Sequence, residues 1–212
     1  MDDRFINGVS GVILVGGKSR RYGQNKALVT INGVPLIKRV LGVLENLFPS
    51  IILVTNTPDI YSFLNLPMFE DKIKGLGPLG GIFTGLNVIS EKAGFFVACD
   101  MPFLNPDLIR YQATVQEGYD VVVPTLSGQF EALHALYTQN CLPGIEQMIH
   151  AGVYQTIQLY RSVSVRYVEE REIRRFDPEL KSFSNINKPE ELAMLQLNRQ
   201  KDRASKILLL EQ

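Results

Sequence analysis

The sequence predicts an α/β fold of three layers, in which a mostly parallel sheet is covered by helices on both faces. Two observations lead to this class. Short apolar runs alternate along the chain with segments of helical periodicity, as in successive βα units. Several of these runs are apolar almost throughout, which is typical of strands buried on both faces. Irregular segments cluster after the runs, where an open α/β sheet binds its ligand.

The apolar runs give the predicted strands. They are residues 11–15, 51–56, 94–100, 119–124 and 164–169. Between the first two, Asn32-Gly33 lies among apolar residues and favours a hairpin-like turn.

Three segments between or after these strands are predicted to be helical: residues 35–48, 78–90 and 105–116. In the first, Leu36, Val40 and Leu44 follow helical spacing, so one face should pack on the sheet. Pro78 suits the first turn of the second helix. Asn105 is a plausible N-cap of the third. A final helix is expected over residues 188–212.

Composition limits the function. The chain has 212 residues with 45% apolar and 21% charged residues, which suits one globular domain over residues 1–212. Lys plus Arg equals Asp plus Glu at 22 each, so nucleic-acid binding is not expected. Cys99 and Cys141 are too few for a disulfide scaffold, and neither a signal peptide nor a membrane span is recognisable. We therefore expect a cytoplasmic protein without a membrane partner.

The glycine-rich stretch VGGKSRRYGQNK, residues 15–26, carries four cations and no acid. It matches neither the P-loop nor the dinucleotide fingerprint. Gly16 and Gly17 would nevertheless let backbone amides approach an anion. The cations that can neutralise phosphate charge are Lys18, Arg20, Arg21 and Lys26. An oligophosphate is the natural ligand, although a solvated charged turn has the same composition.

With four further stretches, this loop resembles the small-molecule nucleotidyltransferases, and in its double-glycine form the molybdenum cofactor guanylyltransferases. The further stretches are residues 71–82, 96–104, 131–137 and 183–192. The resemblance covers about residues 9 to 195 and implies a Rossmann-like nucleotidyltransferase fold. The sequence departs from the family pattern at Val15, Tyr22, Asn25 and Ala132, where Ala, Met, Asp and Pro are usual.

Asp100 is the best candidate metal ligand. It ends the predicted strand 94–100, so its carboxylate should lie at the carboxyl edge of the sheet, where it can hold Mg²⁺ together with phosphates and waters. A cap of the following turn is the structural alternative. No D-x-D pair surrounds Asp100, which argues against glycosyl transfer.

Asp71 bears on the choice of base. Guanine presents an N1–H and an N2 amino group on one edge, two donors that a carboxylate accepts, whereas cytosine has only its N4 amino donor. The resemblance assigns Asp71 to guanine and Asn56 to the nucleotide as well. Simple surface polarity is the alternative for both.

The resemblance also implies the remaining roles. Catalytic residues would be Arg21, Lys26 and Asp100. Residues contacting GTP would be Leu14, Val15, Gly16, Gly17, Arg21, Lys26, Asn56, Asp71, Gly77, Pro78, Leu79 and Asp100. Asn185 and Asn187 would bind molybdopterin, although Asn187 also suits the N-cap of the final helix. His134 is expected to be structural rather than catalytic.

The implied reaction is transfer of GMP from GTP to the terminal phosphate of molybdopterin, with Mg²⁺ as cofactor and molybdoenzymes as possible recipients of the product. Four alternatives stay open at this point. They are a cytidylyltransferase acting on the same pterin, a transferase for another phosphorylated metabolite, a nucleotide-binding regulator without turnover, and a structural or partner-binding protein that uses the long final helix.

Overall fold

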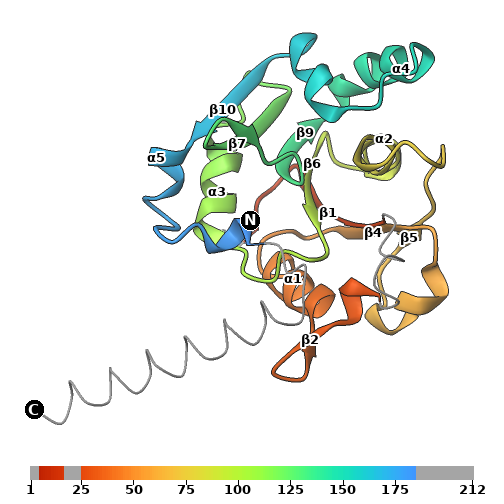
Figure 1. The fold of residues 1–212 in the computed structure, drawn as a ribbon, viewed down its shortest axis with the longest axis vertical. Helices are drawn as coiled ribbons and strands as arrows, with labels where there is room; N and C mark the ends of the chain where they lie inside the picture. Colours follow the sequence, from red (N-terminus) through yellow and green to blue (C-terminus); the bar gives the residue numbers. More distant parts are fainter. Residues whose placement is uncertain (1–4, 17–24, 185–212) are drawn as a thin grey trace, which may run out of the picture.

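One large sheet forms the centre of the molecule (Figure 1), in a computed structural model that describes residues 5–16 and 25–184. The strand order is β10-β7-β9-β6-β1-β4-β5, and β8 pairs with β7. The bounds are β1 (Val9–Val15), β4 (Ile51–Thr55), β5 (Met68–Phe69), β6 (Ala93–Ala98), β7 (Val121–Leu126), β8 (Gln129–Phe130), β9 (His134–Thr138) and β10 (Val165–Glu169). All five predicted strands are present, with ends shifted by one or two residues.

Most pairings are parallel. Strand β1 pairs in parallel with β4 and β6, β5 with β4, and β10 with β7. Strand β9 is antiparallel to both of its neighbours, β6 and β7. The prediction of a mostly parallel sheet is therefore confirmed, with a reversal of direction at β9 that the sequence pattern did not indicate.

Helices cover both faces of the sheet. Their bounds are α1 (Leu36–Leu44), α2 (Pro78–Val88), α3 (Pro106–Thr114), α4 (Leu142–His150) and α5 (Glu170–Ile173). Residues of α1, α3 and α5 join one apolar cluster, and residues of α2 and α4 join another on the opposite face (Figure 1). The three-layer prediction is confirmed. The prediction did not include α4, α5, strand β9 or the short strands β5 and β8.

Short 3-10 helices complete the connections: η2 (Lys26–Leu28), η3 (Pro58–Leu64), η4 (Gln139–Cys141), η5 (Thr156–Arg161) and η6 (Lys181–Phe183). The predicted hairpin is formed by β2 (Thr30–Ile31) and β3 (Val34–Pro35). Asn32 and Gly33 join them with φ values of 52° and 77°, as a tight two-residue turn requires. The predicted final helix, residues 188–212, lies outside the described residues.

Two caps set the ends of the helices that flank the carboxyl edge. The Asn105 side chain accepts hydrogen bonds from the amides of Asp107 and Leu108, which confirms it as the N-cap of α3. Pro78 is in the first turn of α2, after Gly77 with its φ of 61°. Both helices therefore start where the sequence pattern placed them.

The glycines of α2 let this helix lie close to the sheet. A Cβ on Gly85 would lie 2.5 Å from the Phe96 ring, and one on Gly81 would lie 2.9 Å from Leu14. Real side chains do not pack at such distances. These glycines are thus required by the contact of α2 with β1 and β6.

Candidate functional site

The loop that carries Asp100 leaves the sheet at the end of β6. This strand ends at Ala98 rather than at Asp100. The Cys99 amide makes the last ladder bond to β1, donating to Leu14 O at 3.2 Å, and the chain then turns, with Met101 N donating back to Ala98 O at 3.4 Å. Asp100 therefore lies in a turn just beyond the strand, at the carboxyl edge.

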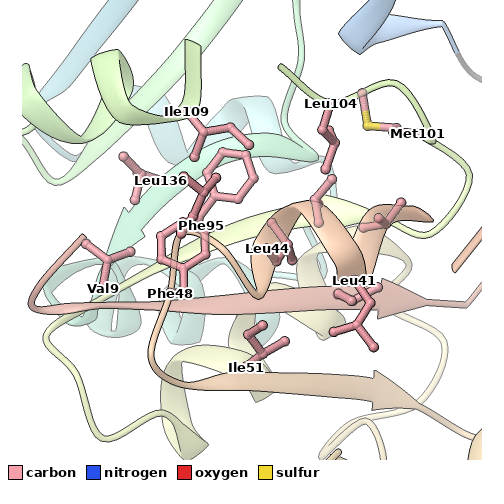
Figure 2. Packing of buried hydrophobic residues seen from close by; sticks show 14 of the residues in the cluster. Val9, Leu41, Leu44, Phe48, Ile51, Phe95, Met101, Leu104, Ile109 and Leu136 are labelled. Atoms are coloured by element: carbon pink, nitrogen blue, oxygen red, sulfur yellow. The ribbon is translucent and has the colours of Figure 1, made fainter. Parts of the chain in front are cut away.

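Apolar side chains anchor this turn from behind. Met101 and Leu104 are buried, with exposed fractions of 2% and 6%, and belong to the cluster that includes Leu44 and Phe95. Figure 2 shows Leu104 directed into this cluster, with Met101 at its margin. The position of the Asp100 backbone is thus fixed by the packing of its neighbours in the core.

Asp100 and Lys26 come together at this edge. Burial raises the pKa of the Asp100 carboxyl, and the Lys26 ammonium opposes this rise. The predicted pair of cation and carboxylate is thus placed within electrostatic reach, although the two residues are far apart in sequence. Cys99, beside Asp100, has its pKa raised to about 12, mainly by burial, so its thiol stays protonated near neutral pH and is not a nucleophile.

Asn25 holds the turn that presents Lys26. Its Oδ1 accepts from Ala27 N at 3.1 Å as the N-cap of η2, and its Nδ2 donates to the buried Tyr61 hydroxyl at 2.7 Å. The amide thus satisfies a backbone donor and a buried hydroxyl at once. Asn at this position therefore has a structural role that the sequence did not reveal.

Asn56 and Asp71 form a second polar pair. Asn56 follows β4, and its Nδ2 donates to Asp71 Oδ2 at 2.6 Å. Asp71 N in turn donates to Asn56 Oδ1 at 3.2 Å. Two residues that resemblance assigns to the nucleotide are therefore joined directly, which orients the Asp71 carboxylate.

The remaining predicted contacts differ in exposure. Gly16, Gly77 and Pro78 are exposed and Val15 is half-buried. Leu14 and Leu79 have exposed fractions of 8% and 0% and pack between β1 and α2. Any contact of these two leucines with a nucleotide would therefore use their backbone atoms.

Several predicted site residues lie outside the described part of the chain. They are Gly17, Arg21, Asn185 and Asn187, together with Lys18 and Arg20 of the same loop.

Asp100 suits a divalent cation by its donor chemistry. It is a partly buried carboxylate with a raised pKa, so a cation beside it would stabilise its charged form. Within residues 5–16 and 25–184 no three His, Cys, Asp or Glu side chains gather as a metal cluster. Mg²⁺ does not need such a cluster, because it commonly binds one or two carboxylates and completes its shell with phosphates and waters.

Comparison with known proteins decides the family. The model of the MobA-like NTP transferase domain matches residues 11–165. The chain belongs to this family. A probable molybdenum cofactor guanylyltransferase from Pelotomaculum thermopropionicum is 36% identical over 200 residues, which cover 94% of this chain and 98% of that protein. A molybdenum cofactor guanylyltransferase from Desulfosudis oleivorans is 36% identical over 189 residues, 88% of this chain and 94% of that protein.

Solved structures agree with this membership in the MobA-like family. The molybdopterin-guanine dinucleotide biosynthesis protein A from Archaeoglobus fulgidus superposes with a TM-score of 0.77 at 28% identity, covering 91% of this chain and 99% of that one. A 2-C-methyl-D-erythritol 4-phosphate cytidylyltransferase from Thermus thermophilus has a TM-score of 0.66 at 13% identity, covering 89% of this chain and 98% of that one. The latter shows a shared fold alone.

In this MobA-like chain, His134 lies in the core, as expected. It is fully buried, with its ring 5.2 Å from that of Phe95 and 4.8 Å from that of Phe183. Burial lowers the pKa of its imidazole to about 4. A neutral, enclosed ring of this kind supports the sheet rather than the chemistry.

One cavity lies apart from the residues assigned to GTP. It has a volume of about 710 Å³ and is lined by Arg166, Tyr167, Glu169, Arg171, Glu172 and Arg175, none of which the MobA-like resemblance assigns to a ligand.

Among the described residues, no helix is both long and apolar enough to cross a membrane.

Proposed function

We propose that this protein transfers GMP from GTP to the terminal phosphate of molybdopterin, with or without its molybdenum, and releases pyrophosphate. The observation that carries this proposal is the placement of Lys26 beside Asp100 at the carboxyl edge of a MobA-like domain. The names of its relatives support guanine as the base and the molybdenum cofactor as the acceptor.

In this mechanism the acceptor phosphate is itself the nucleophile. A phosphate monoester is largely dianionic near neutral pH, so no side chain has to be activated for attack. Positioning and neutralisation of charge then dominate the rate. The oxygen of the acceptor phosphate attacks the α-phosphorus of GTP in line, the α–β bridging bond breaks, and its electron pair leaves with pyrophosphate.

Each residue of the site has a part in this proposal. Asp100 would hold Mg²⁺, which when bound polarises the α-phosphoryl group and neutralises the triphosphate. Lys26 and Arg21 would stabilise the charge that develops on pyrophosphate. Backbone amides at Gly16, Gly17 and Gly77 would contact phosphates.

Base and acceptor recognition would involve the remaining residues. Asp71, oriented by Asn56, would accept the two donors on the guanine edge. Asn185 and Asn187 would contact molybdopterin. The product would then pass to molybdoenzymes that use the guanine dinucleotide form.

The test is transfer of α-labelled nucleotide onto molybdopterin by the purified protein with Mg²⁺, offering GTP and CTP in parallel. Labelled dinucleotide from GTP alone is the expected result. Product from CTP alone would identify a cytidylyltransferase, and product from neither would leave a transferase for another acceptor or a regulator that only binds nucleotide. Replacing Mg²⁺ with chelator should abolish the transfer.

A further inference from the structure

The sheet opens at its carboxyl edge between β6 and β9. The two strands pair as far as Val97 opposite His134, and Ala98 N donates to Leu133 O at 3.3 Å. Beyond this point they part. On the β6 side the chain turns, with Met101 N donating back to Ala98 O at 3.4 Å, whereas Glu131 N donates to Pro124 O of β7 at 3.0 Å. A split therefore begins here, with Asp100 on one side and Glu131 on the other.

This split lies at the change of strand direction. Strand β6 is parallel to β1, and β9 is antiparallel to β6. In open α/β sheets, ligands bind outside the carboxyl ends of strands where neighbouring connections diverge. Glu131 thus belongs to the same edge as Asp100, but on the side away from Lys26 and β1.

The backbone around Glu131 is firmly held. His134 N donates to Glu131 O at 3.0 Å, and the Tyr137 hydroxyl donates to Ala132 O at 2.9 Å. The Tyr137 hydroxyl also lies 2.9 Å from that of Tyr160, in the core on the other face. The backbone of the segment that carries Glu131 is therefore held in position by these hydrogen bonds.

Within the described part of the chain, nothing donates a hydrogen bond to the Glu131 carboxylate. It is half-buried, and burial alone raises its pKa. Among residues 5–16 and 25–184, no group forms a hydrogen bond or ion pair with this side chain. A carboxylate held partly out of water without a donor is unfavourable, and a ligand with N–H groups would offset that cost.

We propose that Glu131 binds the pyrimidine edge of the acceptor's pterin, accepting hydrogen bonds from its N3–H and its 2-amino group. The inference rests on the proposed function, which supplies a pterin as acceptor. A 2-amino-4-oxo pterin presents the same pair of adjacent donors as guanine. The chain then uses one carboxylate for each heterocycle of the product, Asp71 for guanine and Glu131 for pterin.

The first test compares Glu131→Gln with Glu117→Gln, a control at an exposed position, in the full-length protein. The amide has nearly the same shape but loses the charge and replaces one acceptor with a donor. We expect the KM for molybdopterin to rise roughly 10- to 100-fold in Glu131→Gln, with the KM for GTP unchanged. An unchanged KM for molybdopterin would overturn the proposal.

The second test needs no turnover. Equilibrium titration measures binding of a 2-amino-4-oxopterin phosphate ester and of its 2,4-dioxo counterpart, which has an acceptor in place of the amino donor. The wild type should bind the amino form at least about tenfold more tightly, and Glu131→Gln should lose this preference.

These measurements separate two kinds of failure. A wild type that transfers no GMP yet prefers the amino pterin would refute the proposed reaction while keeping Glu131 as a pterin ligand. A wild type that transfers GMP but binds both pterins equally would refute the role of Glu131 alone. If Glu131→Gln does not fold, equal binding of the two pterins by the wild type still refutes the role of Glu131.

Discussion

Asn56 and Asp71 exchange two hydrogen bonds, one between their side chains at 2.6 Å and one from the Asp71 amide to the Asn56 side chain at 3.2 Å. The pair joins the end of β4 to the loop that leads into α2. Because both Asn56 groups are used to hold Asp71, the carboxylate has a fixed direction rather than the freedom of a surface side chain. This order is what recognition of a planar base edge requires.

Asp71→Asn should lower kcat/KM for GTP by about 10- to 100-fold and reduce the preference for GTP over CTP. The amide replaces one acceptor with a donor, which would face the donors of guanine. Competition between labelled GTP and CTP measures the ratio. Asp59→Asn, at an exposed position in η3, is the matched control. A ratio that stays at the wild-type value would remove Asp71 from base recognition.

Asp100→Ala should remain folded and lose about 10²- to 10³-fold in turnover, because it removes the proposed metal ligand. The fold should tolerate the change, since Met101 and Leu104 anchor the turn from within the core. Circular dichroism checks folding, and labelled-product formation measures turnover. Near-normal turnover in a folded variant would refute the assigned role.

Lys26→Met should shift the acid limb of the pH profile to higher pH. Lys26 lowers the Asp100 pKa, so without this cation the carboxyl protonates at a higher pH and the active carboxylate is lost earlier on acidification. The measurement is kcat/KM against pH. Lys38→Met, in α1, provides a control in which no shift is expected, because Lys38 lies instead over the Phe63 ring. If the acid limb of the Lys26→Met profile stays at the wild-type pH, Lys26 does not lower the Asp100 pKa.

The sequence allowed most of the sheet to be predicted, because buried strands such as β4 are apolar at almost every position. It did not reveal the antiparallel β9, since apolar content carries no information on direction. The end of β6 was also misplaced. Cys99 continues the apolar run, but the chain turns after Ala98, where Met101 N donates back to Ala98 O. Strand direction and strand ends are decided by tertiary pairing.

The candidate site was likewise predicted only in part from the sequence. Lys26, Asp71 and Asp100 were predicted because each lies in a motif of recognisable spacing, and Asn56 because the resemblance assigns the end of the strand 51–56 to the nucleotide. In the sequence, Asn25 stands out only as a departure from the usual Asp of the family. Its contact with Tyr61 links residues 36 positions apart. The sequence did not indicate Glu131 as a ligand-binding residue, because its place at the carboxyl edge depends on the strand to which its amide donates. Such roles become visible only when distant segments are placed together.

His134 makes one contribution to stability depend on pH. Its imidazole has a folded pKa of about 4 against an ordinary value near 6.5, so the unfolded chain takes up the proton first. The contribution of His134 should therefore be complete above about pH 6.5 and decline as the pH falls toward 4, by on the order of 3 kcal/mol. Glu172, whose pKa is lowered to about 2, affects stability only at lower pH.

Urea unfolding of wild type and His134→Phe at pH 7 and pH 5 measures this effect. The wild type should lose about 2 kcal/mol between these values, and His134→Phe should lose much less, whatever its absolute stability. His150→Gln, at the exposed end of α4, should behave like the wild type. Equal losses in wild type and His134→Phe would show that His134 is not the titrating group.

Gly85→Ala and Gly42→Ala are the same chemical change in two helices, and they should have opposite effects. In α2, a Cβ on Gly85 would lie 2.5 Å from the ring of Phe96, which is fully buried and packs edge-on against Tyr137. The ring has no space to move, so we expect a loss of about 1–3 kcal/mol. In α1, no atom lies within 4 Å of a Cβ on Gly42, and alanine should stabilise the helix by about 0.5–1 kcal/mol. Urea unfolding at pH 7 measures both. If both substitutions change the free energy of unfolding in the same direction, the close approach of α2 to the sheet is contradicted. The position of the Gly77-Pro78 turn depends on this approach.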